Sequence, residues 1–156
     1  MAWEVPGNEA VPNPAPGFVV SFVAFHERGF SMPPHDFLRG LLQYYGVGLH
    51  HLTPNFILHA ATFVALCEGF LDIPANFDLW KRFFRAKLQH PKDRERPTKQ
   101  EEYGPGCVAV AGCGSGYPQH FHNSSNKGWR EEWFYLHDAG GDLPAFVNRL
   151  PRETDA

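Results

Sequence analysis

The stretch from Thr53 to Leu88 constrains the fold most, because two aromatic-rich segments flank a proline turn within it. The first segment, TPNFILHAATFVALCEGF, is apolar around most of its girth at helical spacing, which is typical of a helix at the centre of a core. Thr53 suits the N-cap and Pro54 the first helical position. The segment is too short and too interrupted to span a membrane. Its predicted core-facing stripe comprises Phe56, Ala60, Phe63, Cys67 and Phe70.

A second amphipathic helix is predicted from Asn76 through the basic residues that end at Leu88. Asp78 lies near the predicted helix N-terminus, where a negative charge is favourable, and basic residues fill the last turns. The aromatic face of this helix includes Trp80, which we expect to pack against the first helix.

The rest of the chain predicts four more elements. FVVSFVAF, from Phe18 to Phe25, is rich in β-branched and aromatic residues and predicts a buried strand. A helix is expected from Ser31 to about Tyr45, ended by Gly46. Two further strands, at 107–111 and 133–137, are expected to form a small antiparallel hairpin. The predicted class is α+β: about three core helices, an N-terminal strand and a small C-terminal antiparallel hairpin.

Length and composition indicate one domain, since 156 residues with 43% hydrophobic content can bury one core. We expect a loose, proline-rich leader at 1–17, a single domain at 18–147 and a polar tail at 148–156. Three cysteines give no disulfide framework, and the N-terminus has no signal-peptide pattern. We therefore expect an intracellular protein, in either the cytoplasm or the nucleus.

The candidate ligands for a metal site are Cys107, Cys113, His120 and His122. Zinc sites usually bring ligands in close pairs two to four residues apart. Here five residues separate the cysteines and one residue separates the histidines, and alternate strand residues point to opposite faces. The preferred interpretation is two ordinary cysteines and a histidine-bearing loop, with no metal and no cofactor.

No other catalytic group stands out. Cys67 and His59 are two helical turns apart, roughly 12 Å, so a small buried thiol explains Cys67 better than a nucleophile does. The glycine-rich stretch 112–116 lacks the Lys-Ser/Thr of a phosphate loop and predicts a turn. His50 and His51 are interpreted as neutral loop histidines. We expect a protein that is not an enzyme.

A basic run between Lys81 and Lys99 holds eight basic residues against two acidic ones, although the whole chain has a formal charge of −3. With aromatic residues interleaved it could bind RNA or DNA; as a plain charge run it would be a solvated segment. Its aromatic residues are expected on the apolar, buried helix face. The candidate nucleic-acid-binding residues are Lys81, Arg82, Arg85, Lys87, Lys92, Arg94, Arg96 and Lys99.

Three motifs in order carry a resemblance to a known family: FVVSFVAFHERGFSMPP, then YYGVGLHHLTPNFILHAATFVALCEGFLDIPANFDLWKRFFRAKL, then SNKGWREEWFYL. Between about Phe18 and Pro144 the chain resembles the gypsy-type transposon (transposase-like) domain of plant retrotransposon-derived proteins. This resemblance implies mobile-element ancestry and carries over no catalytic residues. A transposase of the type that uses three acids and two metals needs a mixed sheet, which this sequence does not predict.

The leading functional hypothesis is therefore a non-catalytic structural or protein-interaction module, Gag-like in character, whose partner is another protein or a second copy. The alternative is a nucleic-acid-binding accessory domain that uses the basic segment 81–99. An enzyme with an unrecognised site ranks third. No membrane contact and no small-molecule substrate are predicted.

Overall fold

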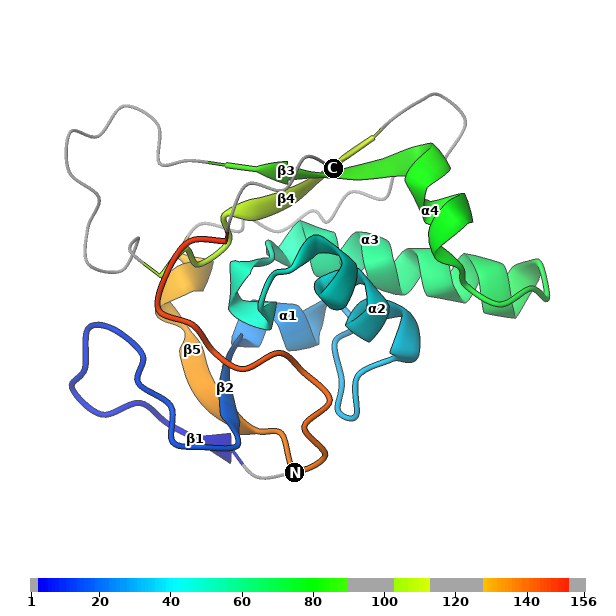
Figure 1. Cartoon of the computed structure of the whole chain (residues 1–156). Helices are drawn as coiled ribbons and strands as arrows, with labels where there is room; N and C mark the ends of the chain where they lie inside the picture. Colours follow the sequence, from blue (N-terminus) through cyan, green and yellow to red (C-terminus); the bar gives the residue numbers. More distant parts are fainter. Residues whose placement is uncertain (1–2, 90–102, 113–127, 152–156) are drawn as a thin grey trace.

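The computed structural model describes residues 3–89, 103–112 and 128–151. Figure 1 shows a three-stranded sheet on one side of a group of helices and a two-stranded sheet above them. The predicted α+β class is confirmed.

In chain order the elements are β1 (Trp3–Glu4), β2 (Phe18–Phe22), α1 (Val23–Glu27), α2 (Asp36–Tyr45), the 3-10 turn η1 (Leu49–His51), α3 (Pro54–Val64), the π-helical turn η2 (Ala65–Phe70), α4 (Phe77–Phe83), β3 (Phe84–Leu88), β4 (Val108–Gly112), the 3-10 turn η4 (Trp129–Glu131) and β5 (Trp133–His137).

Both strands expected near the C-terminus form in antiparallel ladders, but with partners other than each other. β5 pairs with β2, with Phe22 opposite Trp133, and also with β1, so the sheet order is β1-β5-β2. β4 pairs with β3, with Phe84 opposite Gly112. Each of these strands instead pairs with an earlier strand of the chain, a choice that local pattern does not specify.

The N-terminal part of the structure corrects two expectations. The strand expected over residues 18–25 ends at Phe22, because the chain turns there into α1. Part of the expected loose leader is held against the sheet, since β1 pairs with β5 and Trp3 contacts Phe134 edge to face. The hydroxyl of Tyr135 also donates to the carboxylate of Glu9 at 2.8 Å.

The helix ends follow the sequence signals closely. The Thr53 hydroxyl accepts a hydrogen bond from the Phe56 amide at 3.1 Å, which caps α3, and Pro54 occupies its first turn as predicted. Gly46 ends α2 in the left-handed conformation, with φ 66°. This conformation costs glycine little, so the predicted stop is confirmed.

The second predicted helix is shorter than expected. It starts as predicted, with Asn76 as N-cap, but ends at Phe83, and Phe84 is already extended at φ −136° and ψ 153°. The following FRAKL alternates apolar and charged residues with period two, and as β3 its charged residues are exposed while the others are buried or half-buried. Pairing with β4 favours this strand over two more helical turns.

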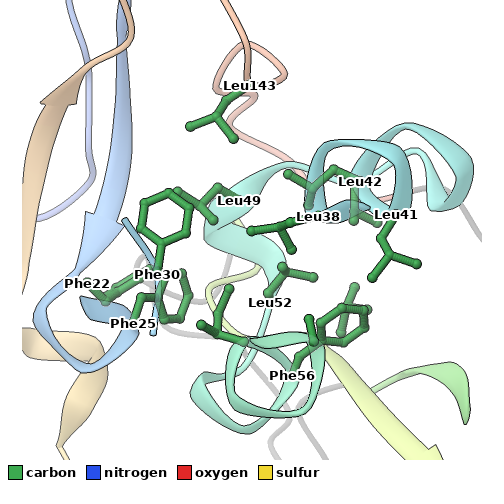
Figure 2. Packing of buried hydrophobic residues seen from close by; sticks show 14 of the residues in the cluster. Phe22, Phe25, Phe30, Leu38, Leu41, Leu42, Leu49, Leu52, Phe56 and Leu143 are labelled. Carbon is green, nitrogen blue, oxygen red and sulfur yellow. The ribbon is translucent and has the colours of Figure 1, made fainter. Parts of the chain in front are cut away.

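One hydrophobic core connects the three-stranded sheet with the helices. Figure 2 shows Leu38, Leu49 and Leu52 converging between α2 and α3. Trp80 of α4 is 0% exposed, and its ring lies 5.4 Å from that of Phe63 on α3. Its predicted place in the core is confirmed. Among the described residues, no helix is long and apolar enough to cross a membrane.

Candidate contact surfaces

The cysteine and histidine residues do not assemble a metal site within the described part of the chain. No group of three His, Cys, Asp or Glu side chains lies close enough there to hold an ion. Cys107 is buried, and this burial raises the pKa of its thiol to about 12, so the thiol is protonated at neutral pH. Cys113, His120 and His122 lie outside the described residues, so the expectation of no zinc stays a prediction.

Cys67 is a buried thiol in the core, as expected from the sequence. It is 1% exposed, and burial, together with the neighbouring Glu68 carboxylate, raises its pKa. A catalytic thiol needs a lowered pKa and access to substrate, and Cys67 has neither.

His50 and His51, interpreted from the sequence as neutral loop histidines, lie just before α3. They are buried in the 3-10 turn η1, with ring centroids 3.9 Å apart, and the sequence did not predict this burial. Burial lowers the pKa of both imidazoles, for His50 to well below its usual value with a further contribution from His51. The Gly48 amide donates to Nδ1 of His51 at 3.0 Å, which requires that nitrogen to be unprotonated.

The two histidines hold the C-terminal segment. Nε2 of His50 lies 3.1 Å from the Val147 carbonyl and Nε2 of His51 lies 2.9 Å from the Arg149 carbonyl. Gly48 makes this arrangement possible, because a Cβ at this position would lie 2.7 Å from Cε1 of His50. The two imidazoles therefore fix the C-terminal segment to η1, and we call His50 and His51 the histidine clasp. The only sequence signal for it was the proximity of two histidines to a glycine.

A groove of about 1120 Å³ lies between α2 and the C-terminal segment. Its best candidate for ligand binding is Arg39, but this guanidinium already contacts the Asp36 carboxylate at 3.1 Å and the Asp142 carboxylate at 3.6 Å. It also donates to the Asp142 carbonyl. This internal pairing occupies the Arg39 guanidinium with carboxylates of the same chain.

The basic run begins on α4 and continues along β3. All four of its described residues, Lys81, Arg82, Arg85 and Lys87, are exposed. Lys81 contacts Asp78 at 3.9 Å, whereas no ion pair forms at the other three within the described residues. The remaining candidates, Lys92, Arg94, Arg96 and Lys99, lie outside the described residues.

The aromatic residues interleaved with these cations face inward. Trp80 and Phe84 are buried and stack at 4.4 Å, and Phe83 is half-buried. As expected, they are not available as a platform on which bases could stack. The described basic surface therefore offers charge without stacking.

An apolar tip lies at the end of the α3–η2 helix; we use this name for Phe70, Leu71 and Ile73. Figure 1 shows the turn after this helix projecting to the right, past α2. The three side chains are 83%, 54% and 38% exposed, respectively. Phe70 was expected in the core stripe, seven residues after the buried Phe63.

The π-helical turn explains this difference. The Leu71 amide bonds the Leu66 carbonyl, five residues back, at 3.0 Å. A π-turn takes more residues than an α-turn, so the stripe rotates away from the core after Cys67. π-turns are frequent at functional sites, and here the turn carries a phenylalanine into solvent.

An apolar hollow of about 210 Å³ lies on the side of the same helix. Ile57, Ala60 and Val64 of α3 form one wall, and Phe30 and Leu38 contribute to the other. At its border, the His35 imidazole lies 3.2 Å from the Glu68 carboxylate. One helix thus presents both a projecting and a recessed apolar surface.

In a comparison with protein families, residues 19–88 fit the model described as "Putative gypsy type transposon". The match includes β2, the α-helices and β3, and ends before the third motif, SNKGWREEWFYL. Comparisons with curated proteins and with solved structures give no match. Residues 19–88, which include the helices and the apolar tip, are therefore similar to the gypsy-type transposon family, and this similarity covers less than half of the chain.

Proposed function

We propose that this protein is a non-catalytic, self-associating module of a plant gypsy-type retroelement protein, Gag-like in its role. The observation that carries the proposal is the apolar tip, whose Phe70 is 83% exposed at the projecting end of α3–η2. Large apolar side chains clustered on a surface commonly mark protein contacts. Retroelement ancestry from the family match supports an assembly role over a metabolic one.

A second copy of the chain is the proposed occupant of this surface. A two-fold symmetric contact needs a surface that is complementary to itself. The α3–η2 helix supplies a projecting part at Phe70 and a hollow of about 210 Å³ beside Val64, and the hollow is large enough for an aromatic side chain. The His35 imidazole and the Glu68 carboxylate, 3.2 Å apart, form a polar border beside this hollow.

Gel filtration over a concentration series tests this proposal. The parent chain is expected to elute earlier as concentration rises, and Phe70→Ser/Leu71→Ser is expected to elute as a monomer throughout. Val5→Ser is a matched control, because Val5 is 71% exposed but belongs to a different part of the chain. A parent that stays monomeric at the highest concentration, or a double variant that associates like the parent, would refute self-association through the tip.

The second candidate function is nucleic-acid binding, and the exposed cations of α4 and β3 favour it. The same gel filtration with single-stranded RNA distinguishes the two. If the basic segment binds RNA, affinity falls with salt with a log–log slope near −0.7 per neutralised phosphate. Replacing Lys92, Arg94, Arg96 and Lys99 by Gln is then expected to remove most of the binding. A monomer that binds RNA tightly and loses it in this variant would favour the second function.

A further inference from the structure

β3 is the outer strand of the two-stranded sheet. Val108 of β4 forms a parallel β-bridge with Leu52, and its carbonyl accepts a hydrogen bond from the Thr53 amide at 3.1 Å. β4 therefore lies between β3 and this part of the fold. Figure 1 shows β3 above β4, on the side away from α3. One edge of β3 therefore faces away from the helices.

The register identifies the backbone groups on that edge. The Gln89 amide donates to the Cys107 carbonyl at 2.6 Å, which makes 89 and 107 a hydrogen-bonded pair. Such pairs alternate along an antiparallel ladder, so Lys87 and Arg85 also bond to β4. The amides and carbonyls of Ala86 and Leu88 point the other way, and no partner for them is found among the described residues.

The side chains of β3 divide by charge. Arg85 and Lys87 are exposed on one face, opposite the small residues Ala111 and Ala109 of β4. Ala86 and Leu88 are half-buried on the other face. No ion pair forms at Arg85 or Lys87 within the described part of the chain.

We propose that this edge binds an extended acidic peptide segment of a partner protein, which adds to the sheet as a strand beside β3. The partner's backbone would pair with Ala86 and Leu88. Its residues opposite Arg85 and Lys87 would be Glu or Asp, two positions apart, with small apolar residues between them. Opposite charges on directly paired strands are favourable, so the partner's acidic residues would lie opposite the two cations of β3.

Two other occupants fit this edge less well. A second copy of β3 would place Arg85 opposite Lys87 or each opposite itself, and like charges across a strand pair are destabilising. Single-stranded nucleic acid would gain from the charges, but its sugar–phosphate chain does not match the alternating amides and carbonyls of a strand edge. Of the aromatic rings between the cations, Trp80 and Phe84 are buried and Phe83 is half-buried, so none of them is a fully exposed stacking surface.

Fluorescence anisotropy with labelled seven-residue peptides tests the proposal. A peptide alternating Glu and Val is expected to bind at least tenfold more tightly than one alternating Lys and Val. N-methylation of the alternate amides on one peptide edge is expected to abolish binding, because it removes strand donors without changing charge. This variation is made in the peptide and so does not depend on how protein variants fold.

Charge reversal in the protein supplies the specificity test. Arg85→Glu/Lys87→Glu is expected to lose the Glu/Val peptide and to gain the Lys/Val peptide, whereas Lys81→Glu/Arg82→Glu, with the same charge change on α4, keeps the original preference. Phe70→Ser/Leu71→Ser is expected to bind the peptide normally, which separates this surface from the tip. Equal binding of methylated and unmethylated peptides, or tight binding of a labelled oligo-uridine with no peptide preference, would overturn the proposal.

Discussion

Phe63 and Phe70 occupy the same stripe in the sequence and opposite environments in the structure. Phe63 on α3 is 1% exposed and its ring contacts those of Phe37 and, edge to face, Trp80, whereas Phe70 at the end of η2 is 83% exposed. Seven residues in a regular α-helix return to nearly the same face. The π-turn between them changes the number of residues per turn, so Phe70 does not return to the face of Phe63. The first part of the helix packs in the core, and its end is exposed to solvent.

An apolar residue at core spacing is therefore not always a core residue. The stability of the domain depends on the aromatic cluster around Trp80, and the surface available for contact depends on where the helix leaves that cluster. Variants that change either the aromatic cluster or the exposed helix end, but not both, separate stability from surface contact.

Trp80→Ala is expected to have the largest effect, a loss of about 3–5 kcal/mol in unfolding free energy. The ring is 0% exposed, stacks with Phe84, and its Nε1 donates to the Tyr45 hydroxyl at 3.2 Å. Such a loss approaches the whole stability of a small domain. Thermal unfolding measures it, and a melting temperature equal to that of the parent would contradict this core.

Thr53→Ala is expected to cost about 1 kcal/mol, because it removes the cap on the Phe56 amide at the start of α3. Thr53→Ser retains a hydroxyl and is the matched control, with little change expected. Urea unfolding of the three proteins measures the difference. Equal losses for the Ala and Ser variants would show that the hydroxyl is not what stabilises this helix end.

Acid is expected to destabilise the histidine clasp. The folded state keeps His50 and His51 neutral with lowered pKa values, while in the unfolded chain they take up protons near pH 6.5. Their contribution to stability is therefore fully present above about pH 6.5 and is lost as pH falls below it. Unfolding free energies across pH 7.5 to 5 are expected to fall less steeply for His50→Gln than for the parent, and parallel curves would contradict the role of His50.

The sequence predicted features that are encoded locally. The Thr53 cap, the Gly46 stop and the burial of Trp80 each follow from a residue type at a defined position, and the structure confirms them. The family resemblance was also readable from the ordered motifs, and residues 19–88 confirm it.

The features that the sequence did not predict depend on distant partners. FRAKL has a period-two pattern, but its basic residues also suit a helix C-terminus, and only pairing with β4 decides for a strand. The partner of β5 is β2, more than one hundred residues earlier, which local spacing does not encode. Burial of His50 and His51 depends on the C-terminal segment that packs over them.

The most direct test of the account is the pair of unfolding free energies for Phe63→Ala and Phe70→Ala in a denaturant titration of dilute, monomeric protein. Both variants remove the same ring from one predicted stripe. Phe63→Ala is expected to lose about 3–5 kcal/mol, and Phe70→Ala to stay within about 0.5 kcal/mol of the parent. Losses of similar size at both positions would show that Phe70 belongs to the core and that the apolar tip is not a free surface.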